Sequence, residues 1–452
     1  MKYNKIILWS VIVAFGGFIF GFDTAVISGA EQEIQNLWNL SDTMIGQTVA
    51  MALYGTIIGA LLGGFPSEAF GRKKTLLIVA ILFLISAVGS AFSPGVYSLM
   101  FFRFVGGLAV GVSSVVAPMY ISEISPSNKR GQLTALFQFN IVVGILISYL
   151  SNYFIGGGSN GNWRIMLGIE IIPAVLFLIL ILFVPRSPRW LILKKGLIEE
   201  AKSVLKEIDP SEVANNITLI QLSKENGESE VGLKEFFSGK FNFPISLAFL
   251  IAFFNQLSGI NAVIYYSPRI FVETGMGESA SLLSSVGVGF INLIATLIGI
   301  LLIDRMGRKF LMYICSFGYI ISLGFISLTF YTGFGEGTLL IPILIFAFIA
   351  SHAVGQGAVI WVFISEIFPN NVRSYGNSLG SGTHWIFAAF IAAVFPFVTS
   401  TLGEGITFAI FTFIMLFQLL FVWKMMPETK NKSLEELEKI MNKINNESKV
   451  SK

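Results

Sequence analysis

The sequence is poor in the residues from which enzyme centres, metal sites and disulfide-linked domains are built. One cysteine and two histidines in 452 residues exclude an internal disulfide and give no metal-ligand spacing. No P-loop, GxSxG or HExxH string is present, so an ATP-driven pump or a membrane hydrolase has no support. We therefore expect no enzyme activity, no metal ion and no cofactor.

Charge is also scarce. Only 13% of the residues are charged, against roughly 25% in an ordinary soluble domain. The net charge is +3 and the basic residues lie in short loops, which argues against nucleic acid as a partner. Apolar residues make up 54% of the chain and the mean hydropathy is +0.75. This composition indicates an integral membrane protein whose surroundings are the lipid bilayer.

The apolar runs are continuous and about twenty residues long, which favours membrane-spanning helices over the alternating strands of a β-barrel. Hydropathy and the breaks between runs predict twelve spans, at 6–29, 44–64, 75–93, 98–121, 132–155, 163–184, 243–272, 280–303, 309–332, 339–365, 375–398 and 404–426. The first run has no small-residue cleavage pattern before its acidic exit at Glu31. We expect it to be a retained helix rather than a signal peptide.

The distribution of charge predicts the orientation. Basic residues concentrate after even-numbered spans, at 71–74, 129–130, 186–195, 305–309, 373 and 424–432. The loops on the other side carry the acids Glu31, Glu33, Asp42, Glu278, Glu336 and Glu404. The positive-inside rule therefore predicts that both termini are cytoplasmic. The short loops suit a bacterial inner membrane.

An internal repeat organises the chain. GGFPSEAFGRKK after the second span returns as GILLIDRMGRKF after the eighth, and ISEISPSNKRG after the fourth returns as ISEIFPNNVRS after the tenth. Two halves of the same topological sense are typical of carriers with a site between the halves and alternating access. The predicted parts are a six-helix half at 1–184, a cytoplasmic linker with short helices at 185–242, a second six-helix half at 243–426 and a cytoplasmic tail at 427–452.

The repeated loops bring acids and arginines together. The acids Glu68, Glu123, Asp304 and Glu366 lie at helix ends within reach of Arg72, Arg130, Arg308 and Arg373 from neighbouring loops. Charge-assisted hydrogen bonds between them would hold the halves together on the cytoplasmic side and break when that side opens. The alternative is solvated anchoring at the membrane interface.

Asp23 is the one ionisable residue in the first predicted span. A carboxylate in mid-span costs about 2.5–3.5 kcal/mol on insertion scales. Arg103 is the only basic residue inside the fourth span, so we expect the two side chains to pair and offset each other's desolvation. Protonation of Asp23 would then release Arg103 and couple proton entry to a conformational change. A static pair that only fixes helix packing is the alternative.

Several strings in order resemble one family. The duplicated GRK loops, RFVGGLAVGVSSVVAPMYISEISP, GNWRIMLG, PRSPRW, NQLSGINAVIYYSP and MPETKNKSLEELE resemble the sugar porters of the major facilitator superfamily over nearly the whole chain. That family includes bacterial proton-coupled xylose and glucose transporters and animal facilitative glucose transporters. The resemblance implies an all-α membrane protein with the major facilitator fold, and it matches Asp23 and Arg103 to the acid and arginine of the proton symporters.

Sugar recognition needs neutral hydrogen-bonding groups and an aromatic face rather than charge. The spans supply Gln138, Asn255, Gln256, Asn261, Asn292, Gln356, Trp361, His384 and Trp385. The resemblance puts Gln138, Gln256, Asn261, Asn292 and Trp361 on sugar-contacting positions, and Phe20 and Tyr265 on the aromatic lining. For each amide, the alternative is an interhelical hydrogen bond worth about 0.6 kcal/mol.

The chain also departs from the family pattern. Asn255 stands where glutamine is frequent, His384 replaces an amide, and Ala388 occupies a position that is often asparagine, so no particular sugar carries over. Arg186 replaces the usual glutamate of PRSPRW. The tenth span, with GQGAVIW, lacks the prolines of the facilitative relatives, which weakens the expectation of an unwound hinge there. We expect His384 and His352 to be hydrogen-bonded and neutral.

The leading hypothesis is a monomeric, proton-coupled symporter of a hexose or pentose that works by alternating access. A facilitative uniporter, or a symporter of a polyol such as inositol, is the alternative. A transporter-like sugar sensor is disfavoured because no long cytoplasmic extension follows the last predicted span.

Overall fold

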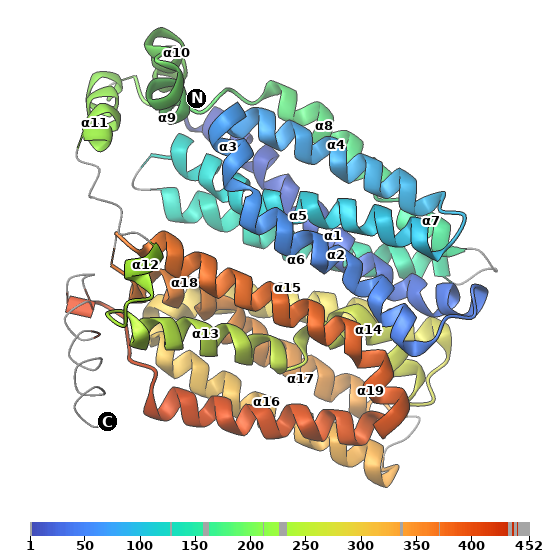
Figure 1. Ribbon diagram of the computed structural model, residues 1–452. Helices are drawn as coiled ribbons and strands as arrows, with labels where there is room; N and C mark the ends of the chain where they lie inside the picture. The colour runs from blue at the N-terminus through green and yellow to red at the C-terminus, as the bar shows by residue number, and fades with distance from the viewer. Residues whose placement is uncertain are drawn as a thin grey trace. The chain divides into compact units, whose positions relative to one another are not determined.

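The computed structural model describes residues 2–126, 129–156, 162–210, 212–225, 233–334, 338–369, 371–432, 436–437 and 441. In this part of the chain all regular structure is helical (Figure 1). In chain order the helices are α1 (Lys2–Leu37), α2 (Asp42–Leu62), α3 (Gly64–Phe70), α4 (Arg72–Ala91), α5 (Val96–Ile124), α6 (Arg130–Gly156), α7 (Asn162–Gly168), α8 (Ile171–Leu180), η1 (Ile181–Phe183), α9 (Pro188–Trp190), η2 (Leu191–Lys195), α10 (Ile198–Ile208), α11 (Val213–Glu225), α12 (Leu233–Phe236), α13 (Asn242–Leu257), α14 (Ile260–Val272), α15 (Glu278–Met306), α16 (Arg308–Thr332), α17 (Leu340–Val354), α18 (Gln356–Ile367) and α19 (Arg373–Lys424).

Eleven helical stretches among the described residues are long and apolar enough to cross a membrane. The count is one below the prediction because α19, with 52 residues, contains both the eleventh and the twelfth predicted spans. Gly403 separates them, since its φ of 80° and ψ of 160° lie outside the helical region. The prediction of an all-α membrane protein with twelve spans is therefore confirmed.

Three boundaries differ from the prediction. Helix α1 continues past Glu31 to Leu37, so the predicted exit at this acid was wrong; Glu31 is fully buried in the helix instead of meeting water. The seventh predicted span is two helices, α13 and α14, separated at Gly259, whose φ is 85°. The tenth is also two helices, α17 and α18, which separate at Gly355 although no proline is present. Glu336, placed in an outer loop by the sequence, lies outside the described residues.

The chain divides into two compact units, residues 1–40 with 48–227 and residues 41–47 with 228–452. In the first unit α1 packs along α6 and α4 along α5, whereas in the second α13 and α16 pack along α19 and α15 along α17. The predicted linker is divided, because α9, α10 and α11 fall in the first unit and α12 in the second. The four predicted domain ranges stay a prediction.

Glycine allows α1 and α6 to approach closely in the first unit. A Cβ atom on Gly21 would collide with the main chain of Ile141, and one on Gly144 would collide with the carbonyl of Phe18. Small residues at such crossings let helix backbones pack tightly in lipid. This crossing lies two residues before Asp23 and so fixes the position of that acid along α1.

The short helix α10 is the one predicted from LIEEAKSVLKEI. Its buried residues Ala201, Leu205 and Ile208 recur at helical spacing on one face. An ion pair of 3.0 Å between Lys5 Nζ and Glu207 Oε2 links α1 to α10. The predicted short helix is therefore confirmed, and it packs on the first unit.

Candidate functional site

The predicted contact between Asp23 on α1 and Arg103 on α5 is present in the first unit. Their exposed fractions are 2% and 1%. One terminal nitrogen of Arg103 donates to the Asp23 carboxylate, and the other donates to the Asp23 main-chain oxygen at 3.1 Å. The Nε of Arg103 has no acceptor among the described residues. The arginine is thus bound to Asp23 through two atoms and retains one unused donor.

A third ionisable residue, Glu170, completes this buried group and was missed by the sequence reasoning. It lies at the break between α7 and α8, is 2% exposed, and its carboxyl interacts electrostatically with the Asp23 carboxyl and the Arg103 guanidinium nearby. Its Oε1 has no partner among the described residues. The signal was available, because Glu170 is an acid inside the sixth predicted span, where a charge is costly. Two carboxyl groups therefore interact with the charge of one guanidinium, and one of them, that of Asp23, is bound to it.

The second unit gathers most of the predicted sugar-binding amides around Gln256, near the break between α13 and α14. Gln256 Nε2 donates to Asn255 Oδ1 at 2.7 Å and lies 3.1 Å and 3.2 Å from the two ring nitrogens of His384. Its Oε1 accepts from Asn261 Nδ2 at 2.7 Å. Each polar atom of the Gln256 amide therefore has a partner from the protein.

This network continues into the core of the second unit. Asn255 Nδ2 donates to Gln356 Oε1 at 3.3 Å, and Gln356 Nε2 donates to Gln418 Oε1 at 3.2 Å. Gln418 Nε2 then donates to Ser316 Oγ at 2.9 Å. Gln356, Gln418 and Ser316 are all fully buried. Gln356 therefore connects Asn255 to the buried Gln418. The sequence does not single out Gln418.

Aromatic rings border the same cluster. The ring centroid of His384 is 5.0 Å from that of Trp361 and 4.8 Å from that of Trp385, the latter in an edge-on arrangement. Trp361 is 39% exposed, whereas Trp385 is 8% exposed and Tyr265 2%. His352 contacts a different residue, Tyr319, with its Nδ1 2.6 Å from the phenol oxygen. Both histidines are thus in hydrogen-bond contact, as expected.

Three predicted sugar-site residues lie outside this network. Asn292 is half-buried, and its Oδ1 accepts from Thr296 at 3.5 Å. In the first unit, Phe20 is half-buried against the hydrophobic core. Gln138, on α6, is half-buried too. The network therefore unites only part of the predicted set.

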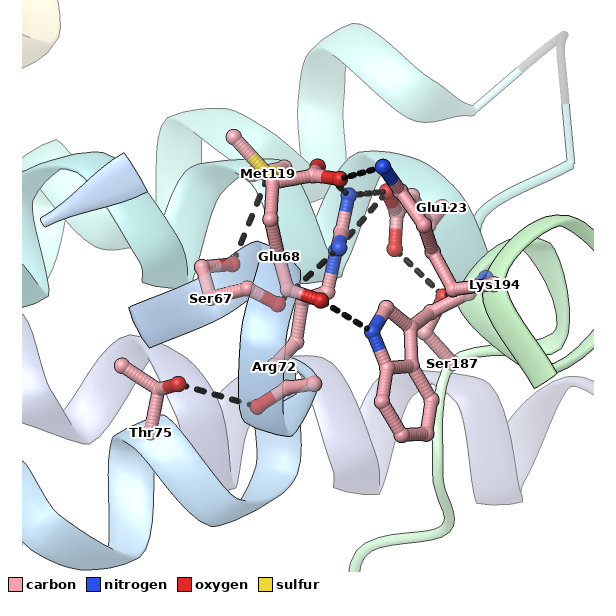
Figure 2. Close-up of polar contacts among 10 residues, drawn as sticks. Ser67, Glu68, Arg72, Thr75, Met119, Glu123, Ser187 and Lys194 are labelled. Carbon is pink, nitrogen blue, oxygen red and sulfur yellow. Dashed lines mark hydrogen bonds and ion pairs between the residues drawn. The ribbon is translucent and has the colours of Figure 1, made fainter. Parts of the chain in front are cut away.

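The repeated loops of the first unit form a compact cluster of charges, shown in Figure 2. Arg72 Nε donates to Glu123 Oε1 at 3.1 Å, and a terminal nitrogen contacts Glu68 Oε1 at 3.2 Å. Lys194 Nζ lies 2.9 Å from the second oxygen of Glu68, and the Ser187 hydroxyl donates to Glu123. Partial burial opposes ionisation of Glu68, but the hydrogen bond from Lys194 and the charge of Arg72 outweigh it, so the pKa of Glu68 is lowered.

The second unit repeats this arrangement around Arg308. Its guanidinium donates to both oxygens of Glu366, at 3.2 Å and 2.8 Å, and to Asp304 at 3.0 Å. The Thr429 hydroxyl donates to Glu366 at 2.6 Å, as Ser187 does to Glu123 in the first unit. The repeat seen in the sequence is therefore a repeat of contacts.

Two of the predicted cluster arginines do not pair with an acid among the described residues. Arg130 is exposed and has no such ion pair, and Arg373 donates to the main-chain oxygen of Phe368 at 3.3 Å. Of the four predicted arginines, Arg72 and Arg308 pair with the acids, because these two lie at the starts of α4 and α16 beside them. These ion pairs join helices of the same unit, and a role in joining the halves stays a prediction.

A cavity of about 400 Å³ opens on the cluster of the first unit. It is lined by Glu68, Arg72, Met119, Ser122, Glu123, Arg189, Trp190, Leu193 and Lys194. The described residues contain no group of three or more histidine, cysteine, aspartate or glutamate side chains that would hold a metal ion.

Comparison with known proteins gives a consistent result. Residues 9–441 match the family described as sugar (and other) transporter. The D-xylose transporter of Levilactobacillus brevis is 38% identical over 94% of this chain and 93% of its own length. The D-xylose-proton symporter of Escherichia coli K12 is 35% identical over 97% and 96%. The inward open structure of the E. coli xylose transporter XylE is 34% identical, covers 96% of this chain and 99% of its own, and has a TM-score of 0.85. The chain therefore belongs to the sugar transporter family, the sugar porters of the major facilitator superfamily.

Proposed function

We propose that this protein carries a hexose or pentose across a bacterial cell membrane together with a proton. Membership of the sugar transporter family supports the sugar. Relatives named D-xylose-proton symporter and arabinose-proton symporter, the latter 37% identical and from Bacillus subtilis, support the proton. The observation that carries the proton coupling is the buried group of Asp23, Arg103 and Glu170.

The charge of this group supplies the physical argument. With all three side chains ionised, two carboxylates face one guanidinium, and one negative charge has no counter-charge among these three residues. Uncompensated charge shielded from water is expensive, and a single bound proton makes the group neutral. Proton binding at Asp23 also weakens its bond to Arg103, so the proton and the contact between α1 and α5 are linked. In a uniporter the same residues would form a static ion pair that only fixes the packing of the helices.

For the sugar we propose the amide cluster of the second unit together with Gln138 of the first. Gln256 has all its polar atoms satisfied by Asn255, Asn261 and His384, so a sugar hydroxyl would replace one of these partners at small net cost. The exposed face of Trp361 suits the C–H side of a sugar ring. Phe20, Tyr265, Asn292, Gln356 and Trp385 are proposed as further lining or supporting residues.

The remaining parts of the proposal concern the cycle and its setting. We propose alternating access by a monomer with both termini in the cytoplasm of a bacterium, since basic residues dominate the loops after even-numbered spans. The clusters around Arg72 and Arg308, with Arg130 and Arg373 nearby in sequence, are proposed to form a cytoplasmic gate whose ion pairs change as that side opens.

Transport in proteoliposomes tests the proposal. We expect an acid exterior to drive accumulation of labelled xylose or glucose, and a protonophore to abolish the accumulation. Unlabelled sugars in excess then rank the substrates, and inositol is included to test the polyol alternative. Uptake that only equilibrates, at any imposed pH gradient, would identify a uniporter instead.

A further inference from the structure

The two charge clusters differ at one corresponding position. Ser187 donates to Glu123 in the first unit, and Thr429 donates to Glu366 in the second, so these two hydroxyl residues occupy equivalent places. The residues immediately before them are then equivalent as well. They are Arg186 in the first unit and Glu428 in the second, so a base stands where the repeat has an acid.

Glu428 caps the start of a helix in the second unit. Its two carboxylate oxygens accept from the main-chain N–H groups of Arg308 at 3.0 Å and of Lys309 at 2.9 Å. These are the first residues of α16, where N–H groups have no acceptor within the helix. One carboxylate therefore caps this helix start through both oxygens and compensates its positive end.

The equivalent helix start in the first unit has no such cap. Arg72 and Lys73 begin the 20-residue helix α4 after Gly71, and no described residue accepts from their main-chain N–H groups. Arg186 cannot accept, and its guanidinium turns to an exposed contact of 3.6 Å with Glu200. The first two main-chain N–H groups of α16 thus bind a carboxylate, whereas the corresponding N–H groups of α4 have no acceptor among the described residues.

A small hollow lies at this uncapped helix start. It is lined by Phe70, Gly71, Arg72, Lys73, Lys74, Arg186, Ser187 and Trp190, and its free volume is about 10 Å³. That is about the room that one water-sized atom needs. Four of the lining residues are basic and none is acidic. The guanidinium of Arg72 is occupied by Glu68 and Glu123, and the Lys73 ammonium donates to the Leu182 carbonyl at 2.8 Å. Lys74 and Arg186 remain as exposed cations.

We propose that the start of α4 binds an oxyanion of the phosphate class, which replaces the carboxylate that Glu428 provides in the second unit. One ligand oxygen enters the hollow and accepts from the N–H groups of Arg72 and Lys73, while Lys74 and Arg186 compensate the charge that stays outside. A sugar is a poor ligand because the hollow is too small for a ring and its lining is cationic. Free phosphate and the headgroup of an anionic membrane lipid both supply this chemistry.

Thermal unfolding of the purified full-length protein tests this site without any transport measurement. In detergent, phosphate should raise the unfolding temperature saturably, by about 2 °C over chloride at equal ionic strength. Arg186→Glu restores the carboxylate of the repeat, so it should raise the unfolding temperature in chloride and abolish the phosphate response. Arg186→Gln should weaken the response by shifting half-saturation to a several-fold higher phosphate concentration. Arg305→Glu changes the charge equally in the second unit and should leave the response intact.

Nanodiscs distinguish the two sources of phosphate. If phosphatidylglycerol but not free phosphate stabilises the protein relative to phosphatidylcholine, and Arg186→Glu removes that difference, the ligand is a lipid. A response to free phosphate that Arg186→Glu removes identifies a soluble oxyanion. Either result supports the site. The proposal is overturned if neither phosphate nor phosphatidylglycerol stabilises the wild-type protein, or if Arg186→Glu leaves the response undiminished.

Discussion

Replacing Asp23 by asparagine tests the coupling mechanism most directly. Asparagine has nearly the same shape, keeps its main-chain oxygen for Arg103 and can offer a side-chain oxygen to the same guanidinium. What disappears is the negative charge and the ability to bind a proton there. We therefore expect a protein that binds and exchanges sugar but no longer accumulates it.

The structure sets the expected size of the change in stability and of the change in sugar accumulation. Removing one partner of a buried ion pair costs about 3–5 kcal/mol, but Glu170 interacts with the charge of Arg103 and remains as a counter-ion. The loss of stability should accordingly stay below that range. For transport, each pH unit supplies about 1.36 kcal/mol, so a gradient of two units drives roughly 100-fold accumulation at one proton per sugar in the wild type. The variant should reach a ratio of about one.

Proteoliposomes with an imposed pH gradient measure the accumulation ratio, and counterflow exchange of labelled sugar shows that the variant is folded and binds substrate. Counterflow without accumulation supports the assignment. Unchanged accumulation by Asp23→Asn would refute it, because no proton could then be carried at this position. Loss of both activities calls for the milder comparison with Glu170→Gln, which leaves the Asp23–Arg103 pair in place.

Three further predictions follow from the geometry. Glu170→Gln removes one of the two acids, so the remaining Asp23–Arg103 pair is neutral without a bound proton. Half-maximal uptake should therefore need a more acid exterior, measured as uptake against external pH. Gly259→Ala places a Cβ atom 2.7 Å from the Phe411 ring at a φ of 85°, and should lower stability by about 1–3 kcal/mol in thermal unfolding. Lys194→Met should raise the lowered pKa of Glu68 toward its ordinary value of 4.5. The carboxylate stabilises the folded state above that pH and loses its effect as the pH falls through its lowered pKa, so the variant's lower unfolding temperature at pH 6 should approach that of the wild type below pH 4.5.

The sequence predicts the spans well because each is a long apolar run bounded by charge or turn residues. It also predicts the contact between Asp23 and Arg103, since each is the sole candidate partner for the other in its region. Hydropathy averages over a window, however, and so it passed over the breaks at Gly259 and Gly355, which lie inside apolar stretches. A backbone conformation at one residue leaves no trace in such an average.

Buried acids caused the other errors. Glu31 was interpreted as a membrane exit although it is fully buried within α1. Glu170 was passed over although it interacts with Asp23. The sequence shows the acid Glu170 but not this neighbour, because Asp23 comes from a distant part of the chain. The pairing of Arg72 with Glu123, rather than of Arg130, depends on the same kind of tertiary information.

The broken and unbroken helices imply that stiffness is unevenly distributed. Asp23 and Arg103 lie on α1 and α5, helices of 36 and 29 residues, although Pro118 lies within the latter. Gln256 and Gln356, in contrast, lie within three residues of the joints at Gly259 and Gly355. In the proposed mechanism, proton binding would act on side chains carried by long helices, whereas sugar binding would act beside joints at which two shorter helices can tilt separately.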